Sequence, residues 1–308
     1  MNSKTNLINP RPAVIKYALS WIIYLKIWLI AQLPYKIIRL IGKGLGRVIQ
    51  LLLVSRKKIV ATNLKICFPK LDSTAIKQLS RRHFTELGLM IVQTIKAFFG
   101  STTSIEQTAI IHGSQHLDAC LAQQQGVLLV TGHFTALDMG AKILCKKYPI
   151  AGMYRPHKNP VVEYMVTKSR LKYAAKMFKR DELRPIIKHL KAGGILWYAP
   201  DQDYRRGRSE FVPFFGKIAS TITATHQMAR LSKCKVLFFH VQRNHKQPYY
   251  TLTISPPLAD FPTKDAIADT ARVNKGIEAM IANNPAEYLW VHKRFKTTAE
   301  GQKNPYES

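Results

Sequence analysis

The sequence has few acidic residues and lacks the short motifs that mark several large protein classes. Asp and Glu total 18 against 47 Lys and Arg, which gives a formal net charge of +29. Such an excess indicates anionic partners: nucleic acid, an anionic membrane surface, or a substrate or protein donor that carries phosphates and carboxylates. No zinc-finger spacing, RNA-recognition block or Gly-x-x-x-x-Gly-Lys loop is present, so we expect no nucleic acid. The absence of a Gly-x-Ser-x-Gly elbow argues against a serine hydrolase.

Cysteine is also scarce. The four residues, Cys67, Cys120, Cys145 and Cys234, are scattered and form no Cys-x-x-Cys pair or short Cys/His ladder. This usage predicts a reduced, cytosol-facing body with no metal site. Each cysteine is predicted to be a small core residue rather than a nucleophile, because unpaired Cys is commonly buried.

Residues 1–34 are predicted to form a membrane anchor. From Val14 to Leu33 the chain is apolar, with Lys16 and Lys26 as its only charges. A bilayer core takes about 20 apolar residues as a helix, so the segment is just long enough to span. No small-residue cleavage site follows it, which indicates a retained anchor rather than a signal peptide. The alternative is that it forms a buried helical hairpin with the next segment.

Residues 35–105 form a predicted basic helical region. Tyr35 to Val54 alternates bulky aliphatic residues with lysine and arginine, a pattern typical of helices at a membrane interface. More basic residues follow the anchor than precede it, which places the body on the cytoplasmic side if the anchor spans the membrane. A further helix is predicted from Asp72 to about Phe99, where Gly100 and four Ser and Thr residues interrupt the pattern.

Residues 106–308 are predicted to form an α/β domain with a mainly parallel sheet flanked by helices. Apolar runs alternate with amphipathic stretches, and the sheet is expected to turn antiparallel near 235–255. Strands are predicted near 107–111, 126–131, 150–154, 195–199, 235–242 and 249–255. Helices are predicted near 114–124, 136–147, 160–169, 182–192, 219–232 and 264–282.

The first candidate site follows the predicted strand that ends at Gly132. His133 comes next, and Asp138 lies five residues later. Ligands of open α/β sheets bind beyond the carboxyl ends of strands, which is where His133 is expected. On one continuous helix the two side chains would point about 140° apart, but they meet if His133 lies in a turn and Thr135 caps the helix. A histidine oriented by a carboxylate is a general base; the alternative is an ordinary surface or hydrogen-bonded histidine.

These residues also carry a family resemblance. Thr131-Gly-His-Phe-Thr-Ala-Leu-Asp138 resembles the His-x-x-x-x-Asp/Glu block of the glycerolipid and lipid A acyltransferases. Five further blocks resemble the late lipid A acyltransferases, which add lauroyl or myristoyl groups, and the likeness extends over residues 14–297. These blocks are Thr62–Pro69, Gly152–Pro160, Trp197–Asp203, Phe211–Gly216 and Tyr288–Lys296.

The resemblance implies a bacterial inner-membrane enzyme with a glycerolipid acyltransferase-like fold and its catalytic domain on the cytoplasmic face. It implies transfer of a fatty acyl group from acyl carrier protein to a hydroxyl on a primary acyl chain of a lipid A precursor. The implied partners are acyl carrier protein, the precursor and anionic inner-membrane lipid. No cofactor is implied beyond the donor's phosphopantetheine. The alternative is a glycerophospholipid acyltransferase of the lysophosphatidate type; a membrane scaffold without activity is disfavoured because the catalytic blocks are retained.

Four catalytic residues are carried over by position. His133 is the implied base and Asp138 its partner, although the late lipid A acyltransferases usually have Glu at the latter position. Arg170 and Asp201 fall where the family places further residues needed for activity. Asp201 is expected to orient a basic partner such as an arginine. Gln202 stands where the family usually has His, so that position is expected to take no catalytic part.

Substrate binding is assigned to Arg155, Lys158 and Asp203. Basic side chains in loops after strands are suited to hold phosphates or sugar carboxylates, and a solvated basic face is the alternative for any one of them. The set is Arg155, Lys158, Arg170, Arg205, Arg206 and Arg208.

Overall fold

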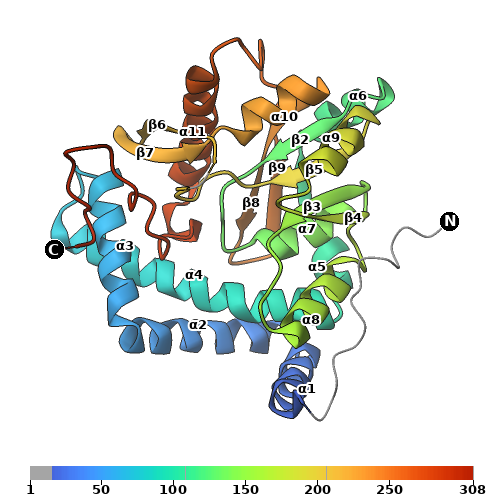
Figure 1. The fold of residues 1–308 in the computed structure, drawn as a ribbon. Helices are drawn as coiled ribbons and strands as arrows, with labels where there is room; N and C mark the ends of the chain where they lie inside the picture. Colours follow the sequence, from blue (N-terminus) through green and yellow to red (C-terminus); the bar gives the residue numbers. More distant parts are fainter. Residues whose placement is uncertain (1–15, 108, 206, 308) are drawn as a thin grey trace.

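A seven-stranded sheet forms the centre of the molecule (Figure 1). The computed structural model describes residues 16–107, 109–205 and 207–307. The strand order is β1-β9-β8-β2-β5-β3-β4, and every pairing is parallel except that of β8 with β9. The strands are β1 (Ile110–His112), β2 (Val127–Val130), β3 (Ile150–Tyr154), β4 (Lys176–Lys179), β5 (Ile195–Tyr198), β8 (Lys235–Arg243) and β9 (Tyr250–Ile254).

Helices cover both faces of this sheet. Alternate residues of β2 point to opposite faces, so Leu128 and Val130 join one buried cluster while Val127 and Leu129 join the other. The first cluster is completed by α9 (Leu183–Lys191), α10 (Ala224–Ser232) and α11 (Ala266–Asn283). The second is completed by α6 (Ser114–Ala122), α7 (Leu137–Cys145) and the end of α4 (Ser73–Phe99). The predicted α/β class and mainly parallel sheet are therefore confirmed.

Two parts of the sheet region were not predicted. β4 forms an edge strand in a stretch without a clear pattern, between α8 (Pro160–Arg170) and α9. The helix expected over 219–232 begins only at Ala224, because the preceding residues form β7 (Lys217–Ile222), which pairs antiparallel with β6 (Ser209–Phe214). The cysteines are free, as predicted; Cys145 alone is only partly buried.

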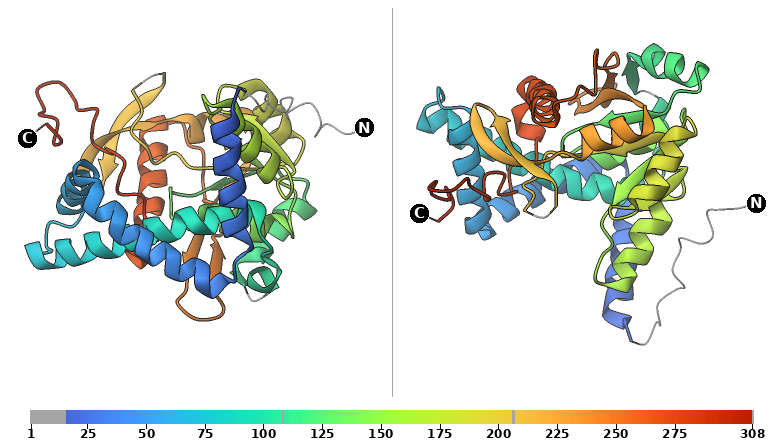
Figure 2. Two further views of the ribbon diagram at one scale, coloured as in Figure 1. Left: turned by 90° about the horizontal axis from the view of Figure 1, so that it is seen from below. Right: turned by 45° about the horizontal axis from the view of Figure 1, so that its top comes forward.

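The N-terminal helix is shorter than a membrane-spanning helix in the part of the chain that the structure describes. α1 (Ala18–Gln32) has 15 residues, which is about 22 Å of helix, whereas a bilayer core is about 30 Å thick. Within the part of the chain that the structure describes, no helix has the length and apolar character needed to cross a membrane. The prediction of a spanning anchor is wrong for these residues, and its first 15 positions lie outside the described ranges. In Figures 1 and 2, α1 projects from the rest of the molecule beside α8.

The next helices pack closely on one another. α2 (Tyr35–Leu52) lies along α4, and α3 (Val54–Cys67) joins them at one end (Figure 2). Glycines make the contact: a Cβ atom added at Gly88 of α4 would lie 2.2 Å from the carbonyl oxygen of Gly42 and 2.4 Å from the nitrogen of Gly46. The start of α4 matches its prediction, since the Asp72 carboxylate accepts the N–H of Ala75 at 2.7 Å.

Candidate active site

The catalytic histidine predicted from the sequence lies directly beyond the central strand β2. Asp201 follows β5, which pairs with β2 in parallel, and the backbone ladder continues to Thr131, whose N–H donates to the oxygen of Tyr198 at 3.0 Å. The carboxyl ends of neighbouring parallel strands meet at one sheet edge. Strand pairing therefore brings His133 and Asp201 together although 68 residues separate them.

One carboxylate holds both the ring and the backbone of His133. Oδ1 of Asp201 lies 2.6 Å from Nδ1 of His133, and Oδ2 accepts the backbone N–H of His133 at 2.9 Å. Asp201 is buried, with 1% of its side chain exposed, whereas 32% of the His133 side chain is exposed. With Nδ1 engaged, Nε2 is the ring nitrogen available to a substrate proton.

The electrostatics of the pair favour charge on both groups. Burial by itself lowers the pKa of His133, but the negative charge of Asp201 and the hydrogen bond to it raise that pKa above its ordinary value. Burial raises the pKa of Asp201, yet the His133 ring and backbone N–H outweigh it and lower that pKa to about 2. Asp201 is consequently ionised at neutral pH and stabilises an imidazolium at position 133.

Asp138 has different partners from those predicted. Its Oδ1 accepts from Nη2 and Nε of Arg170 at 2.9 and 3.2 Å, and its Oδ2 accepts from the Thr94 hydroxyl at 3.2 Å. Arg170, at the end of α8, also lies over the Phe98 ring at 5.7 Å. The predicted pairing of His133 with Asp138 is therefore wrong. Asp201 has a basic partner, as expected, but that partner is His133 and not an arginine. All four residues were predicted to belong to the site, but His133 pairs with Asp201, and Asp138 pairs with Arg170.

The loop between β2 and α7 explains this pairing. Thr135 does not cap α7, whose N-cap is Ala136 with no side-chain hydrogen bond. Buried Arg243 instead donates to the carbonyl oxygen and hydroxyl of Thr135 at 3.0 and 3.3 Å, and it forms an ion pair with Glu86 of α4. The Thr135 N–H donates to the oxygen of Glu287 at 2.8 Å. The loop is thus held in place by buried residues that the sequence reading did not identify.

A large pocket opens at this sheet edge. It has a volume of about 890 Å³, and its lining includes His133, Asp138, Arg170 and Arg155. Apolar side chains make up much of the remainder, among them Met153, Met177, Ile186, Leu137 and Met228. Two buried polar atoms of lining residues, the Tyr173 hydroxyl and the Trp197 Nε1, have no hydrogen-bond partner among the described residues. The pocket therefore combines a proton acceptor, an ion pair and space for an apolar chain.

The substrate-binding candidates occupy different positions. Arg155 lines the pocket and is exposed, whereas Lys158 is exposed in the loop before α8 and is not one of the described lining residues. The carboxylate of Asp203 accepts from the N–H and hydroxyl of Thr297 at 2.9 and 3.0 Å. Its backbone N–H donates to Nε2 of His292 at 3.0 Å, so Asp203 joins two chain segments at the pocket wall. Arg206 lies outside the described residues.

Two further features of the site were missed from the sequence. Thr94 gave no signal because its partner, Asp138, lies 44 residues away on another helix. His292 lies within the Tyr288–Lys296 block, but its contact with Asp203 depends on the folding of the C-terminal segment over the site. No group of three or more His, Cys, Asp or Glu side chains placed to hold a metal ion occurs in the described ranges.

Comparison with known proteins shows the family of this chain. The profile of the family described as bacterial lipid A biosynthesis acyltransferase matches residues 8–297. The chain is 36% identical to the lipid A biosynthesis lauroyltransferase of Escherichia coli (strain K12), over 98% of this chain and 97% of that protein. It is 33% identical to the palmitoleoyltransferase of the same strain, over 94% and 95%.

A further relative is the lipid A biosynthesis acyltransferase of Haemophilus influenzae, which is 34% identical over 99% of this chain and 98% of that protein. Among solved structures, the 1-acyl-sn-glycerophosphate acyltransferase PlsC of Thermotoga maritima aligns with 78% of this chain and 99% of that one. The two share 15% identity with a TM-score of 0.38, too distant to inform the site. On the family profile and the full-length relatives, the chain is an acyltransferase that belongs to the bacterial lipid A biosynthesis acyltransferase family.

Proposed function

We propose that the protein transfers a fatty acyl group from acyl carrier protein to a hydroxyl of a primary acyl chain on a lipid A precursor. The observation that carries the proposal is the His133–Asp201 pair, whose histidine lines a pocket with extensive apolar walls. Its finer points, the donor and the acceptor hydroxyl, go beyond family membership. The relatives are named as lauroyl and palmitoleoyl transferases, which supports a fatty acyl donor.

In the proposed step, Nε2 of His133 takes the proton of the acceptor hydroxyl as the oxygen attacks the thioester carbonyl. The new C–O bond forms, the C–S bond breaks, and the proton passes from the imidazolium to the departing thiolate of phosphopantetheine. Asp201 keeps the ring in one orientation and offsets its developing positive charge. No protein nucleophile and no redox change are required.

Asp138 and Arg170 are proposed to act together rather than as proton carriers. Burial lowers the pKa of Arg170 and the negative charge of Asp138 raises it, and the net result is a pKa above the ordinary value. Arg170 therefore stays charged throughout the working pH range. Only 29% and 18% of the Arg170 and Asp138 side chains are exposed, in the wall of the catalytic pocket. Their fixed dipole and the nearby Arg155 suit the carbonyl and phosphate groups of a phosphopantetheine donor.

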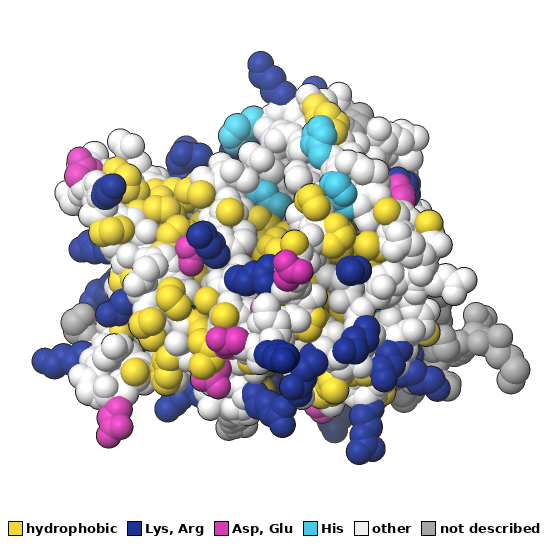
Figure 3. All heavy atoms as spheres, turned by 90° about the horizontal axis from the view of Figure 1, so that it is seen from above, with side chains coloured by type: hydrophobic (Ala, Val, Ile, Leu, Met, Phe, Trp, Pro, Cys, Tyr) yellow, Lys and Arg dark blue, Asp and Glu magenta, His cyan; other side chains and the backbone are white. Residues whose placement is uncertain are grey.

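The N-terminal helices are proposed to attach the enzyme to the cytoplasmic face of the inner membrane without crossing it. α1 exposes Leu19 and Leu25, with 72% and 56% of each accessible, and α2 exposes Leu40, Leu51 and Leu52. Lys36, Lys43 and Arg47 of α2 are also exposed. Apolar side chains inserted among the lipids and cations paired with anionic headgroups act together in interfacial binding. Figure 3 shows that Lys and Arg also gather along one side of another face, with few Asp or Glu among them.

The test of function uses the purified full-length protein in detergent with a labelled acyl group on acyl carrier protein. Lipid A precursor and lysophosphatidate are offered separately as acceptors, and the products are weighed by mass spectrometry. Addition of one acyl group to the lipid A precursor alone is the expected result. Acylation of lysophosphatidate with the precursor unchanged would favour the glycerophospholipid alternative. An acyl-coenzyme A arm tests the identity of the donor.

A further inference from the structure

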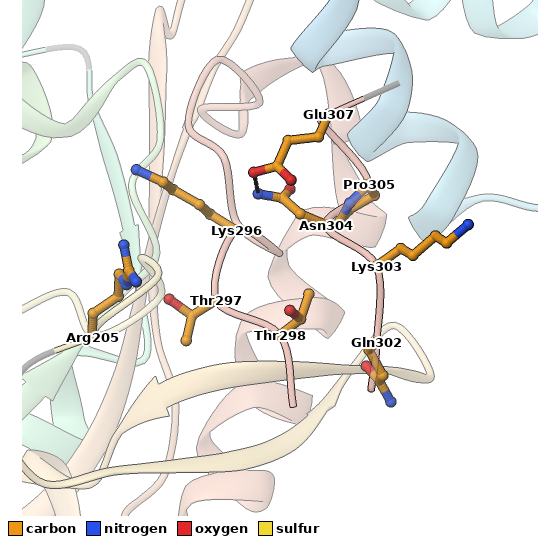
Figure 4. A pocket seen from close by; sticks show the side chains of 9 residues that line it. All are labelled: Arg205, Lys296, Thr297, Thr298, Gln302, Lys303, Asn304, Pro305 and Glu307. Atoms are coloured by element: carbon orange, nitrogen blue, oxygen red, sulfur yellow. Dashed lines mark hydrogen bonds between the residues drawn. The ribbon is translucent and has the colours of Figure 1, made fainter. Parts of the chain in front are cut away.

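A second pocket lies beside the catalytic one, at the C-terminal end of the chain (Figure 4). Its volume is about 860 Å³, and it is formed by Arg205, in the loop after β5, and by residues 296–307. Most of this segment lies beyond residue 297, where the family match ends. We call it the C-terminal pocket.

The lining of the C-terminal pocket is polar and carries an excess of positive charge. Arg205, Lys296 and Lys303 are exposed, and Figure 4 shows that the first two extend to the same side of the pocket. The carboxylate among its described lining residues, Glu307, accepts a hydrogen bond from the Asn304 amide at 2.7 Å. Threonine, glutamine and proline complete the lining, and none of its described residues is a large aliphatic or aromatic one. This chemistry suits a hydrated anion and not an acyl chain.

The two pockets share a wall. Asp203 and His292 line the catalytic pocket, and the Asp203 carboxylate holds Thr297, which lines the C-terminal pocket. Arg205 follows Asp203 by two residues and lies on the other side of the same loop. The two pockets are therefore adjacent, with the contact between Asp203 and Thr297 lying between them.

The C-terminal segment is held in place rather than lying free on the surface. The Tyr306 hydroxyl donates to Oδ1 of Asn63 on α3, and it accepts the backbone N–H of Phe295 at 3.1 Å. The ammonium group of Lys293 lies over the Tyr306 ring at 5.5 Å. These contacts fix residue 306 against the body, so the loop from 296 to 305 is closed at both ends.

We propose that the C-terminal pocket binds a phosphate on the sugar headgroup of the acceptor while the hydroxyl of its acyl chain lies at His133. The proposal rests on the proposed function, because it takes the acceptor to be a phosphorylated, acylated sugar. Lys296 and Arg205 pair with the phosphate oxygens, and Lys303 contributes positive charge from the opposite side. The C-terminal pocket thus selects the acceptor by its charge, separately from the groups that carry out the transfer.

The test compares an acceptor that carries its sugar phosphates with one from which they have been removed, in the full-length enzyme. Lys296→Glu and Arg205→Glu should each raise the KM for the phosphorylated acceptor about tenfold or more, because a charge-assisted pairing is replaced by repulsion. The KM for the dephosphorylated acceptor and for the acyl carrier protein donor should change less than about twofold. Lys296→Arg keeps the positive charge, so its KM for the phosphorylated acceptor should equal that of the wild-type enzyme.

The matched control is Lys235→Glu, which makes the same change of charge at an exposed lysine where β8 begins. It should leave both acceptor KM values unaltered. Tyr306→Phe tests the pocket through its anchor, and it should raise the KM for the phosphorylated acceptor without altering that of the donor. Melting temperatures exclude unfolding as the cause.

Three results would overturn the proposal. Equal KM changes for both acceptors would show a general effect on the site, and no change in either would remove the C-terminal pocket from acceptor binding. An equal effect of Lys235→Glu would assign the result to net charge. Wild-type enzyme that transfers no acyl group to either acceptor would instead refute the proposed function, whereas normal transfer with unaffected variants would refute only the pocket.

Discussion

Two ion pairs lie at the catalytic pocket, each made of one carboxylate and one basic side chain, and they differ in whether the basic side chain can change its charge. Asp201 holds a histidine, whose charge changes near neutral pH, while Asp138 holds an arginine, whose charge does not change. The first pair lies between two loops at the carboxyl ends of adjacent strands, and the second joins α7 to α8. In the proposed mechanism the first pair moves a proton, and the second maintains a fixed charge and joins two helices.

This difference assigns separate roles to residues that the sequence presented as one group. A carboxylate five residues from a histidine suggested a dyad, but the nearby acid serves the helix pair and the distant acid serves the ring. Sequence proximity is therefore a poor guide to which acid orients a histidine beyond a strand. Neighbouring strands in the sheet are the better guide, because their ends converge.

The largest expected effect is that of His133→Ala, which removes the proton acceptor. Loss of a general base typically slows a reaction by about 100- to 10,000-fold, and we expect the upper part of that range in kcat. The rate of acyl transfer to the lipid A precursor measures this directly, with the melting temperature as a folding control. A folded variant that transfers at near the wild-type rate would refute the proposed base.

Asp201→Asn should reduce activity next most strongly, by about 100- to 1,000-fold, because the ring loses its charged partner. The pH profile gives a sharper test. Wild-type activity requires neutral His133, so it should fall as pH drops through a pKa that lies above the ordinary 6.5. Without the Asp201 charge, burial remains to lower that pKa, and the acid limb should move to lower pH. An acid limb that stays in place would dissociate Asp201 from the titration of the ring.

The helix-joining pair should show smaller and coupled effects. Asp138→Asn should lower activity about 10- to 100-fold with no shift of the acid limb, and Asp138→Glu should retain more activity because it keeps the charge. A double-mutant cycle with Arg170→Gln measures the free energy of unfolding. The double variant should lose less stability than the sum of the two single losses, with a coupling of about 1–2 kcal/mol. Strict additivity would show that the two residues act independently.

The smallest expected change is that of Thr94→Val, which removes one hydrogen bond from Asp138. Unfolding measurements should show a loss of about 1 kcal/mol, since that is the usual net value of such a bond. The transfer rate should fall by less than about fivefold. A loss as large as that of Asp138→Asn would place Thr94 in direct contact with substrate.

Local patterns were sufficient for most of the fold. Apolar runs located β2, β3, β5, β8 and β9, and the Asp72 cap located the start of α4. They failed for β4 and for the β6–β7 hairpin, whose strands are short and partly exposed and so lack a strong alternation. The spanning helix was overestimated because the apolar run from Val14 to Leu33 predicts a longer helix than α1, which begins only at Ala18 and ends at Gln32.

The sequence predicted which residues belong to the site but not how these residues pair. The resemblance supplied His133, Asp138, Arg170 and Asp201, all of which line or adjoin the pocket. Pairing could not follow from the sequence, because it depends on the position of β5 next to β2. Arg243 was missed for the same reason: its contact with Thr135 joins residues 108 positions apart.

The glycines between α2 and α4 make the two sides of α2 subject to opposite constraints on sequence change. At Gly46 even an alanine methyl would lie 2.3 Å from the Phe84 oxygen, and at Gly42 it would lie 2.7 Å from a methyl group of Val92. Saturation mutagenesis of α2 should therefore find that positions about one helical turn apart, on the side that faces α4, do not tolerate substitution. The outward side, which carries Leu40 and Leu51, should accept many substitutions that keep a mixed apolar and basic character. Sequence change can therefore alter the outward surface of α2 without disturbing the packing of this helix on α4.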